Sequence, residues 1–221
     1  MIYSALKRAG SIACLVACGA CAQIALETLP PVIAIFASRF DQSTASRIAE
    51  LEKKKDWPGM LRLARAHLQR EPKRADWWFL QGYALARQGQ HEAAIESYRE
   101  ATRLSPEDEG SWLAMGDSEI ELGRPEEAVR AYRQALSYRP ESAPAYLALA
   151  DLYQRQGKLE LALPNFRECV RYDPDLEQGW YGLARAYHLT GQLERRDQAL
   201  LSLRKLDPAA ANQFEKQYLS K

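Results

Sequence analysis

The sequence predicts an all-α protein in which one helical unit is repeated and stacked. Five prolines stand 34 residues apart, at Pro72, Pro106, Pro140, Pro174 and Pro208. A strict period of this length is typical of a supersecondary unit that is copied along the chain. Arrays of this kind work through an extended binding surface, so we expect recognition of a partner rather than catalysis.

Other residues come into register when each unit starts three residues after a proline. An aromatic residue then occupies the fourth position, a small residue the eighth, and glycine the fifteenth. They are Trp78, Trp112, Tyr146 and Trp180; Gly82, Gly116, Ala150 and Ala184; and Gly89, Gly123, Gly157 and Gly191. Small residues let two helices approach closely, and glycine supplies the left-handed conformation that often ends a helix. The proline closes the second helix of each unit, because it has no N–H to donate.

This pattern resembles the tetratricopeptide repeat, whose motif is W-x2-L-G-x2-Y, then A-x3-F, then P. Its second half is carried by alanines followed by a large side chain: Ala94, Ala128 and Ala162, then Tyr98, Tyr132, Phe166 and Leu200. Four clear copies span residues 75–108, 109–142, 143–176 and 177–210. The resemblance implies a right-handed α-solenoid of stacked antiparallel helix pairs. Arg196 stands where the other copies have alanine, so we expect looser packing in the last copy.

The two ends of the array are expected to differ from its middle. Residues 41–74 look like a degenerate fifth copy, with helices over about 43–54 and 57–69. Residues 211–221 belong to a predicted terminal helix that begins near residue 209 and carries Phe214 and Tyr218. A helix in this place would cap the exposed apolar face of the last unit.

Residues 1–22 are interpreted as a signal peptide or a membrane anchor, and residues 23–40 as an apolar linker. Lys7 and Arg8 precede an apolar run over residues 9–22. The segment Leu15-Val16-Ala17-Cys18 resembles a bacterial lipobox, which would make Cys18 the lipidated residue. We therefore expect a protein on the periplasmic side of the cell envelope, as an outer-membrane lipoprotein or with an inner-membrane signal anchor.

Three alternatives for this leader stay open. Residues 20–22, Ala-Cys-Ala, fit an ordinary signal-peptidase site. Residues 9–26 are just long enough for an uncleaved anchor, whereas the apolar segment 29–36 is too short to span a bilayer. A short apolar run could also occur by coincidence in a cytosolic protein.

Composition argues against a nucleic-acid partner, since the net charge is +1 and 27% of residues are charged. Residues 41–74 are an exception, with nine Lys or Arg against five acidic residues. A solvated helix face is the simpler interpretation of this surplus, and contact with a membrane surface or a partner is the alternative.

The sequence contains no pattern that predicts an enzyme. His67, His91 and His188 lack the spacing of metal ligands, and there is no phosphate-binding loop or nucleophile elbow. Cys169 replaces a small core residue and is expected to be buried. We therefore expect no catalytic residue, no metal, no cofactor and no small-molecule substrate.

The resemblance implies that certain positions of each first helix face a concave groove. On these positions lie Phe79, Tyr83, Arg87, Leu113, Asp117, Ile120, Leu147, Asp151, Arg155, Tyr181, Arg185 and His188, with Glu121 and Gln154 further along the helices. The tryptophans of the fourth position are assigned to the core. Phe79 and Tyr83 occupy places where repeats that bind the tails of cytosolic chaperones need Lys and Asn, so that type of clamp is absent.

A groove with aromatic and arginine side chains suits an extended peptide or an amphipathic helix of a partner. The alternative is that some of these rings pack against neighbouring helices or a terminal segment. The functional hypothesis is a non-catalytic adaptor at the bacterial envelope, in the assembly of a pilus or secretion system. A scaffold for cytochrome c maturation, a self-associating membrane-anchored organiser and an accessory subunit of an enzyme are the other candidates.

Overall fold

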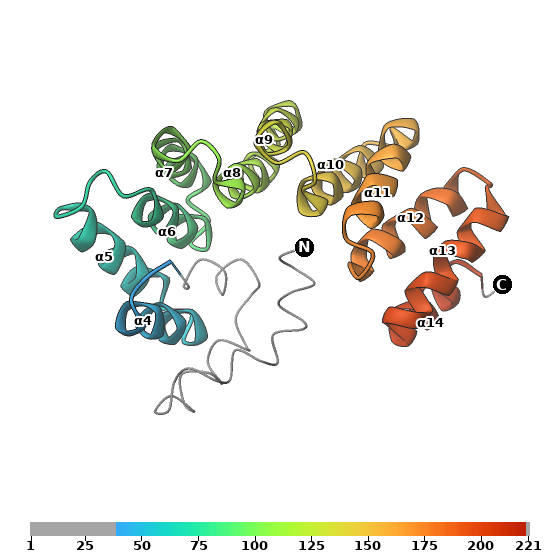
Figure 1. Ribbon diagram of the computed structural model, residues 1–221, viewed down its shortest axis with the longest axis horizontal. Coiled ribbons are helices and arrows are strands. Elements are labelled where there is room, and N and C mark those ends of the chain that lie inside the picture. The colour runs from blue at the N-terminus through green and yellow to red at the C-terminus, as the bar shows by residue number, and fades with distance from the viewer. Residues whose placement is uncertain (1–38, 220–221) are drawn as a thin grey trace. The chain divides into compact units, whose positions relative to one another are not determined.

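The computed structural model describes residues 39–219, in which there are eleven helices and no strand (Figure 1). In chain order they are α4 (Gln42–Lys53), α5 (Trp57–Leu68), α6 (Ala75–Ala86), α7 (His91–Leu104), α8 (Glu109–Glu121), α9 (Pro125–Tyr138), α10 (Ala143–Arg155), α11 (Leu159–Tyr172), α12 (Glu177–Leu189), α13 (Leu193–Leu206) and α14 (Pro208–Tyr218). The predicted all-α architecture of stacked helix pairs is confirmed. The chain divides into two compact units, one ending at Tyr138 and the other beginning at Arg139.

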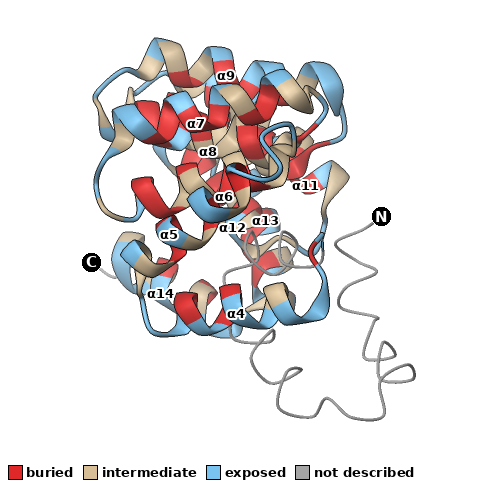
Figure 2. Ribbon diagram, turned by 90° about the vertical axis from the view of Figure 1, so that its left-hand side faces the viewer, coloured by how far each residue is buried: buried red, intermediate tan, exposed pale blue. Residues whose placement is uncertain are grey.

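In the first unit, consecutive helices pack against one another from α4 to α9, most extensively as the pairs α6–α7 and α8–α9. Aspartates begin several of these helices, because Asp41, Asp56 and Asp108 each accept a hydrogen bond from a backbone N–H of the first turn. The core of this unit is formed by large side chains that are at most 2% exposed: Ile48, Met60, Trp77, Phe79, Leu80, Ile95 and Tyr98. Figure 2 shows buried positions on the inner faces of the helices and exposed ones on the outside.

In the second unit, α10 pairs with α11 and α12 with α13, and α14 packs on α13 and α12. Phe166, Cys169, Leu203 and Phe214 are fully buried. Because Phe214 belongs to α14, the terminal helix contributes to the core of the unit, as expected for a cap.

Glycines in the first helix of a pair receive the large ring of a second helix. A Cβ atom added at Gly82 would lie 2.6 Å from the Tyr98 ring, and one at Gly116 would lie 2.3 Å from the Tyr132 ring. The predicted close approach of the paired helices is therefore confirmed in the first unit. In the second unit a glycine joins two successive pairs, because a Cβ at Gly182 of α12 would lie 2.1 Å from Phe166 of α11.

The tryptophans of the fourth position are half-buried, and Trp78 and Trp112 pack against the core of the first unit, so their assignment to the core is confirmed for these two only as a position at its edge. Each indole N–H also donates to the carbonyl oxygen of the proline six residues earlier. The bonds are Trp78 to Pro72 at 2.8 Å, Trp112 to Pro106 at 2.7 Å and Trp180 to Pro174 at 2.8 Å. An indole N–H that is removed from water needs a hydrogen-bond acceptor, and the proline carbonyl supplies it. The bond also connects the end of one repeat to the start of the next.

The turns between paired helices contain glycines in the left-handed region. The φ angles of Gly89, Gly123, Gly157 and Gly191 lie between 70° and 75°, as expected for residues that end a helix. No heavy atom lies within 4 Å of a Cβ added at Gly123, so only backbone conformation opposes a larger residue there.

We expect Gly123→Ala to lower the free energy of unfolding by about 1–2 kcal/mol, because an L-residue is strained in the left-handed conformation. Urea denaturation of the wild type and the variant measures this difference. The Gly123→Asn variant is the control, since asparagine tolerates this conformation, and an equal loss in both variants would contradict the explanation.

Candidate functional site

All twelve predicted groove residues belong to the first helices of the pairs or to the residue that ends them. Those of the first unit lie on α6 and α8, and those of the second on α10 and α12. Each unit therefore carries its own surface, and the two are described separately.

Phe79 is buried completely, so its assignment to the groove is wrong. Its ring centroid lies 5.6 Å from that of Tyr98 and 6.4 Å from that of Tyr83. The cause is the surroundings of α6, which packs against α5, α7 and α8. A helix with apolar residues around its whole circumference is usually buried, and the composition of α6 contained this signal.

Tyr83 lies in a polar and aromatic cluster that connects three helices of the first unit. Its O–H donates to Glu52 Oε1 of α4 at 2.8 Å, and its ring meets the Trp57 ring of α5 edge-on at a centroid distance of 6.2 Å. The Arg87 guanidinium lies over the Trp57 ring, with its Cζ atom 4.8 Å from the ring centroid. We call Glu52, Trp57, Tyr83 and Arg87 the Tyr83 cluster.

Burial dominates the electrostatics of this cluster. Glu52 is only 7% exposed, and its burial raises the pKa of the carboxyl group although the Tyr83 O–H and the Arg87 charge oppose the rise. Burial also raises the pKa of Tyr83, and the neighbouring Glu52 adds to this increase. The sequence did not reveal Glu52 or Trp57 as members of the site, because they belong to the degenerate first repeat.

We expect the variant Glu52→Gln to gain stability relative to the wild type as the pH rises. The folded chain holds the proton of Glu52 more tightly than the unfolded chain, so stability from this group falls as the pH rises from its usual pKa of 4.5 through the raised value. Glutamine can still accept from Tyr83 but does not titrate. Urea denaturation below pH 4.5 and at neutral pH measures the difference between the two proteins, and a difference independent of pH would contradict the assignment.

The other predicted residues of the first unit lie on α8. Leu113 and Ile120 are half-buried, and Asp117 is exposed. Asp117 Oδ1 accepts a hydrogen bond of 2.7 Å from the O–H of Tyr132, the ring that packs on Gly116. Asp117 therefore joins the two helices of its own pair, in addition to its place on the surface.

Arg185 is the centre of a second polar cluster, on the surface of the second unit. Its Nε donates to Gln154 Oε1 of α10 at 2.7 Å, and its Nη2 lies 3.9 Å from Asp151 Oδ1. Burial raises the pKa of Asp151, although Arg185 and Arg155 both oppose the rise. We call Asp151, Gln154, Arg155 and Arg185 the Arg185 cluster; Leu147, one turn before Asp151, is half-buried.

Tyr181 and His188 contact the terminal helix α14, as the alternative interpretation of these rings proposed. The ring of Tyr181 meets Phe214 edge-on at a centroid distance of 5.5 Å, and its O–H lies 3.3 Å from Gln217 Oε1. The ring of His188 lies 5.3 Å from that of Tyr218. Both residues are half-buried, because α14 covers part of their side chains, and only the remainder is accessible to a partner.

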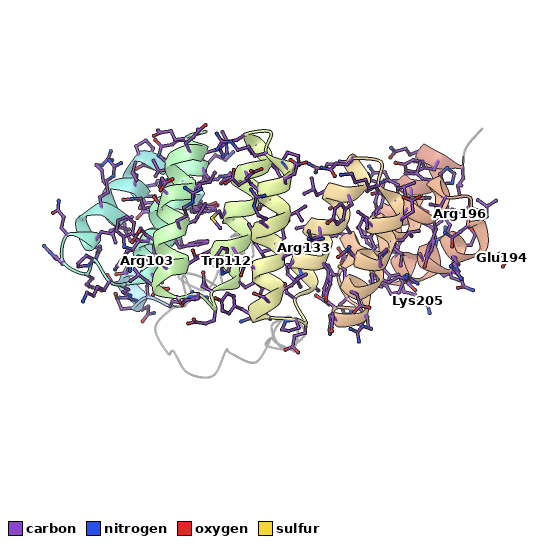
Figure 3. The ribbon with its side chains drawn as sticks, turned by 90° about the horizontal axis from the view of Figure 1, so that it is seen from above. Arg103, Trp112, Arg133, Glu194, Arg196 and Lys205 are labelled. Atoms are coloured by element: carbon purple, nitrogen blue, oxygen red, sulfur yellow. The ribbon has the colours of Figure 1, made fainter. Side chains whose placement is uncertain are left out.

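A hollow of about 490 Å³ lies on another surface of the first unit, between α7, α8 and α9. Arg103 and Trp112, both labelled in Figure 3, line it together with Met115, Arg130 and Tyr138. The Trp112 and Tyr138 rings are stacked at a centroid distance of 6.4 Å. None of the predicted groove residues lines this hollow, which forms between neighbouring repeats and leaves no pattern in the sequence of either one.

Comparison with known families agrees with the helix pairing. Three family models match the chain: a Tetratricopeptide repeat model over residues 60–109, a TPR repeat model over residues 116–157 and a second Tetratricopeptide repeat model over residues 143–176. The chain is a tetratricopeptide-repeat protein. No curated protein matches the sequence closely enough to be counted as a relative.

Several solved structures have a similar fold. MamA is 18% identical with a TM-score of 0.64, over 74% of this chain and 96% of that one. A thermophilic TPR protein of Thermus thermophilus, TTC0263, is 16% identical with a TM-score of 0.62, over 77% and 95%. YrrB, described as a TPR protein with an unusual peptide-binding site, is 17% identical with a TM-score of 0.58, over 75% and 87%. At these identities the similarity shows the fold alone.

Cys169 is fully buried in the second unit. Burial raises the pKa of the Cys169 thiol to about 12, so it is protonated at neutral pH, and its predicted place in the core is confirmed. Between residues 39 and 219, no group of three or more His, Cys, Asp or Glu side chains is placed to hold a metal ion. Tetratricopeptide repeats are in general scaffolds without catalytic function.

The predicted lipidation site Cys18 and the rest of the leader lie outside the described residues. Within the described part of the chain, no helix has both the length and the apolar character that are needed to cross a membrane.

Proposed function

We propose that this protein is a non-catalytic adaptor that holds a segment of a protein partner on the first helices of its repeats. The observation that carries this proposal is the composition of the Tyr83 and Arg185 clusters. Each presents arginine and half-buried side chains from first helices, and the Tyr83 cluster adds two aromatic rings, of which Trp57 belongs to the second helix α5. Aromatic and arginine side chains dominate the binding energy of protein interfaces. The fold shared with YrrB, which is described as having a peptide-binding site, is consistent with this function.

The apolar positions on the same first helices favour a segment with apolar anchors. Leu113 on α8 and Leu147 on α10 are half-buried, one in each unit. The first unit also carries Arg87, and the second carries Arg185. An amphipathic helix or an extended peptide can place apolar side chains on the leucines and carboxylates on the arginines. We expect the partner segment to combine both residue types.

We further propose that the adaptor acts on the periplasmic side of a bacterial envelope, anchored through its leader, during assembly of a machine such as a pilus or secretion system. The lipobox-like segment ending at Cys18 and the apolar run before it support this location. Loss of palmitate labelling in Cys18→Ala would support lipidation, and an unlabelled wild-type protein would overturn it.

Photo-crosslinking tests the binding surface directly. The crosslinking amino acid p-benzoylphenylalanine is placed at Leu113 or Leu147, and as a control at Leu201, which is 58% exposed on the second helix α13. In cells of the source organism, we expect adducts with the same partner from the first two positions and none from the third. Adducts that are equally frequent at all three positions would overturn the proposal.

The same experiment separates self-association from recognition of another protein. Leu193 and Leu201 are 50% and 58% exposed and lie two turns apart on α13, so this helix offers apolar surface to a second copy. Adducts of two copies of the chain, formed from Leu201, would favour a self-associating organiser over an adaptor.

A further inference from the structure

The outer face of α5 carries basic side chains that have no partner among the described residues. Arg62 and Arg65 are exposed on α5, and Arg70 and Lys73 are exposed in the turn that follows it. The helix contains no acidic residue between its first and last residues. We call these four residues the basic face.

Several exposed arginines on other second helices form ion pairs within their own helix. Arg103 of α7 pairs with Glu100 at 2.8 Å, and Arg130 of α9 pairs with Glu127 at 2.7 Å. Arg99 with Glu96 and Arg171 with Glu168 repeat this arrangement. The basic face therefore lacks the ion pairs that these four arginines form, and its charge is uncompensated.

The acidic residues closest in sequence have other partners. Asp56 Oδ1 accepts a hydrogen bond of 2.8 Å from the backbone N–H of Gly59. Asp76 and Glu71 both form ion pairs with Arg74, at 3.2 Å and 3.3 Å. Glu50 pairs with Lys54 at 2.6 Å and with Arg47 at 3.3 Å. These carboxylates are already engaged, so the four cations remain available for an external anion.

The chain enters the array beside this turn. Arg39 Nη1 lies 2.7 Å from Asp108 Oδ1, and the Arg39 carbonyl oxygen accepts a hydrogen bond of 2.8 Å from Arg74 Nη2. The Phe40 ring is buried against Trp77 at a centroid distance of 4.3 Å. These contacts hold the end of the leader at the turn that also carries Arg70 and Lys73.

We propose that the basic face lies against the headgroups of an anionic lipid bilayer, the one to which the leader attaches the protein. This inference rests on the envelope anchoring put forward under the proposed function. If the leader attaches the protein to a membrane, residues 39 and 40 hold the turn with Arg70 and Lys73 close to the lipid surface. Each lysine or arginine near an anionic surface adds about fivefold to the affinity, so four cations together are sufficient to hold this edge of the first repeat on the bilayer.

Hydrogen exchange of the full-length protein in vesicles tests the proposal. The protein is reconstituted into phosphatidylcholine alone, or into an equal mixture of phosphatidylcholine and phosphatidylglycerol. In the anionic vesicles we expect the backbone amides of residues 69–74 to exchange at least about tenfold more slowly than in the neutral ones. High salt should remove this difference, while residues 125–138 of α9 should exchange equally in both vesicles.

Two variants with the same change in net charge identify the surface. The four changes Arg62→Gln, Arg65→Gln, Arg70→Gln and Lys73→Gln should abolish the difference between the vesicles. The matched control replaces Arg99, Arg103, Arg130 and Arg171 by glutamine and should keep it. Equal loss in both variants would show a general effect of net charge and would overturn the proposal.

The outcomes distinguish this proposal from the one on which it rests. If neither type of vesicle retains the protein, the proposed anchoring is wrong. If both retain it but residues 69–74 exchange equally, the anchoring survives and the lipid contact of the basic face is wrong. If soluble polyglutamate, and not phosphatidylglycerol, slows the exchange, the basic face binds an acidic polypeptide, which also overturns the lipid contact.

Discussion

Replacing Phe79 by alanine is expected to lower the free energy of unfolding by about 3–5 kcal/mol, the usual cost of removing a buried aromatic ring. The side chain is fully buried and contacts the rings of Tyr83 and Tyr98. The helices around it belong to three neighbouring pairs, so they cannot easily close the cavity. Urea denaturation of the wild type and the variant measures the loss.

Tyr181→Ala is the matched control for this prediction, because Tyr181 occupies the same position of the last repeat. It is half-buried and contacts Phe214 and Gln217 of the terminal helix. We therefore expect a clearly smaller loss of stability from Tyr181→Ala. If Phe79→Ala unfolds at the same urea concentration as the wild type, Phe79 is a surface residue and the groove assignment would be restored.

The second large effect is expected from Gly116→Ala, which should lower the free energy of unfolding by about 1–3 kcal/mol through overpacking. The new Cβ would lie 2.3 Å from the Tyr132 ring, so the ring must move. Tyr132 is 3% exposed and its O–H is bound to Asp117, and both features resist this movement. Thermal and urea denaturation measure the loss.

Gly110→Ala is the control on the same helix. The nearest heavy atoms to a Cβ at Gly110 lie 3.8 Å away, which is ordinary contact. Because alanine favours helix over glycine, this change should raise stability by up to about 1 kcal/mol. The two substitutions are chemically identical, so opposite signs would show that the ring of Tyr132 causes the difference. A loss of equal size in both would contradict the explanation.

The boundaries of the helices could be predicted closely from the sequence, because local residues determine them. The expected helix over residues 57–69 is observed as Trp57–Leu68, and that over 43–54 as Gln42–Lys53. Glycines with positive φ end the first helix of each later pair, and acidic N-caps or prolines begin several helices. These signals act within a few residues of the chain and need no knowledge of tertiary contacts.

The candidate site could be predicted only in part, because it depends on contacts between helices. The repeat register placed Tyr83 and Arg185 on their helices, but it could not show that their partners are Glu52 and Gln154 of the preceding pairs. Nor could it show that α6 is covered on several sides and buries Phe79. A repeat pattern describes one unit, whereas these features arise where a unit meets its neighbours.

The bond between each indole and the proline before it has a mechanical consequence. Three of the turns between repeats carry this bond, but at the turn after Pro140 the aromatic residue is Tyr146, which has no indole N–H and stacks on Tyr172. If the two ends of the array are pulled apart, we therefore expect it to yield first at this turn. Optical-trap extension should show an early rupture there that Tyr146→Trp delays to a higher force, and an unchanged rupture force would show that the indole bonds carry no load.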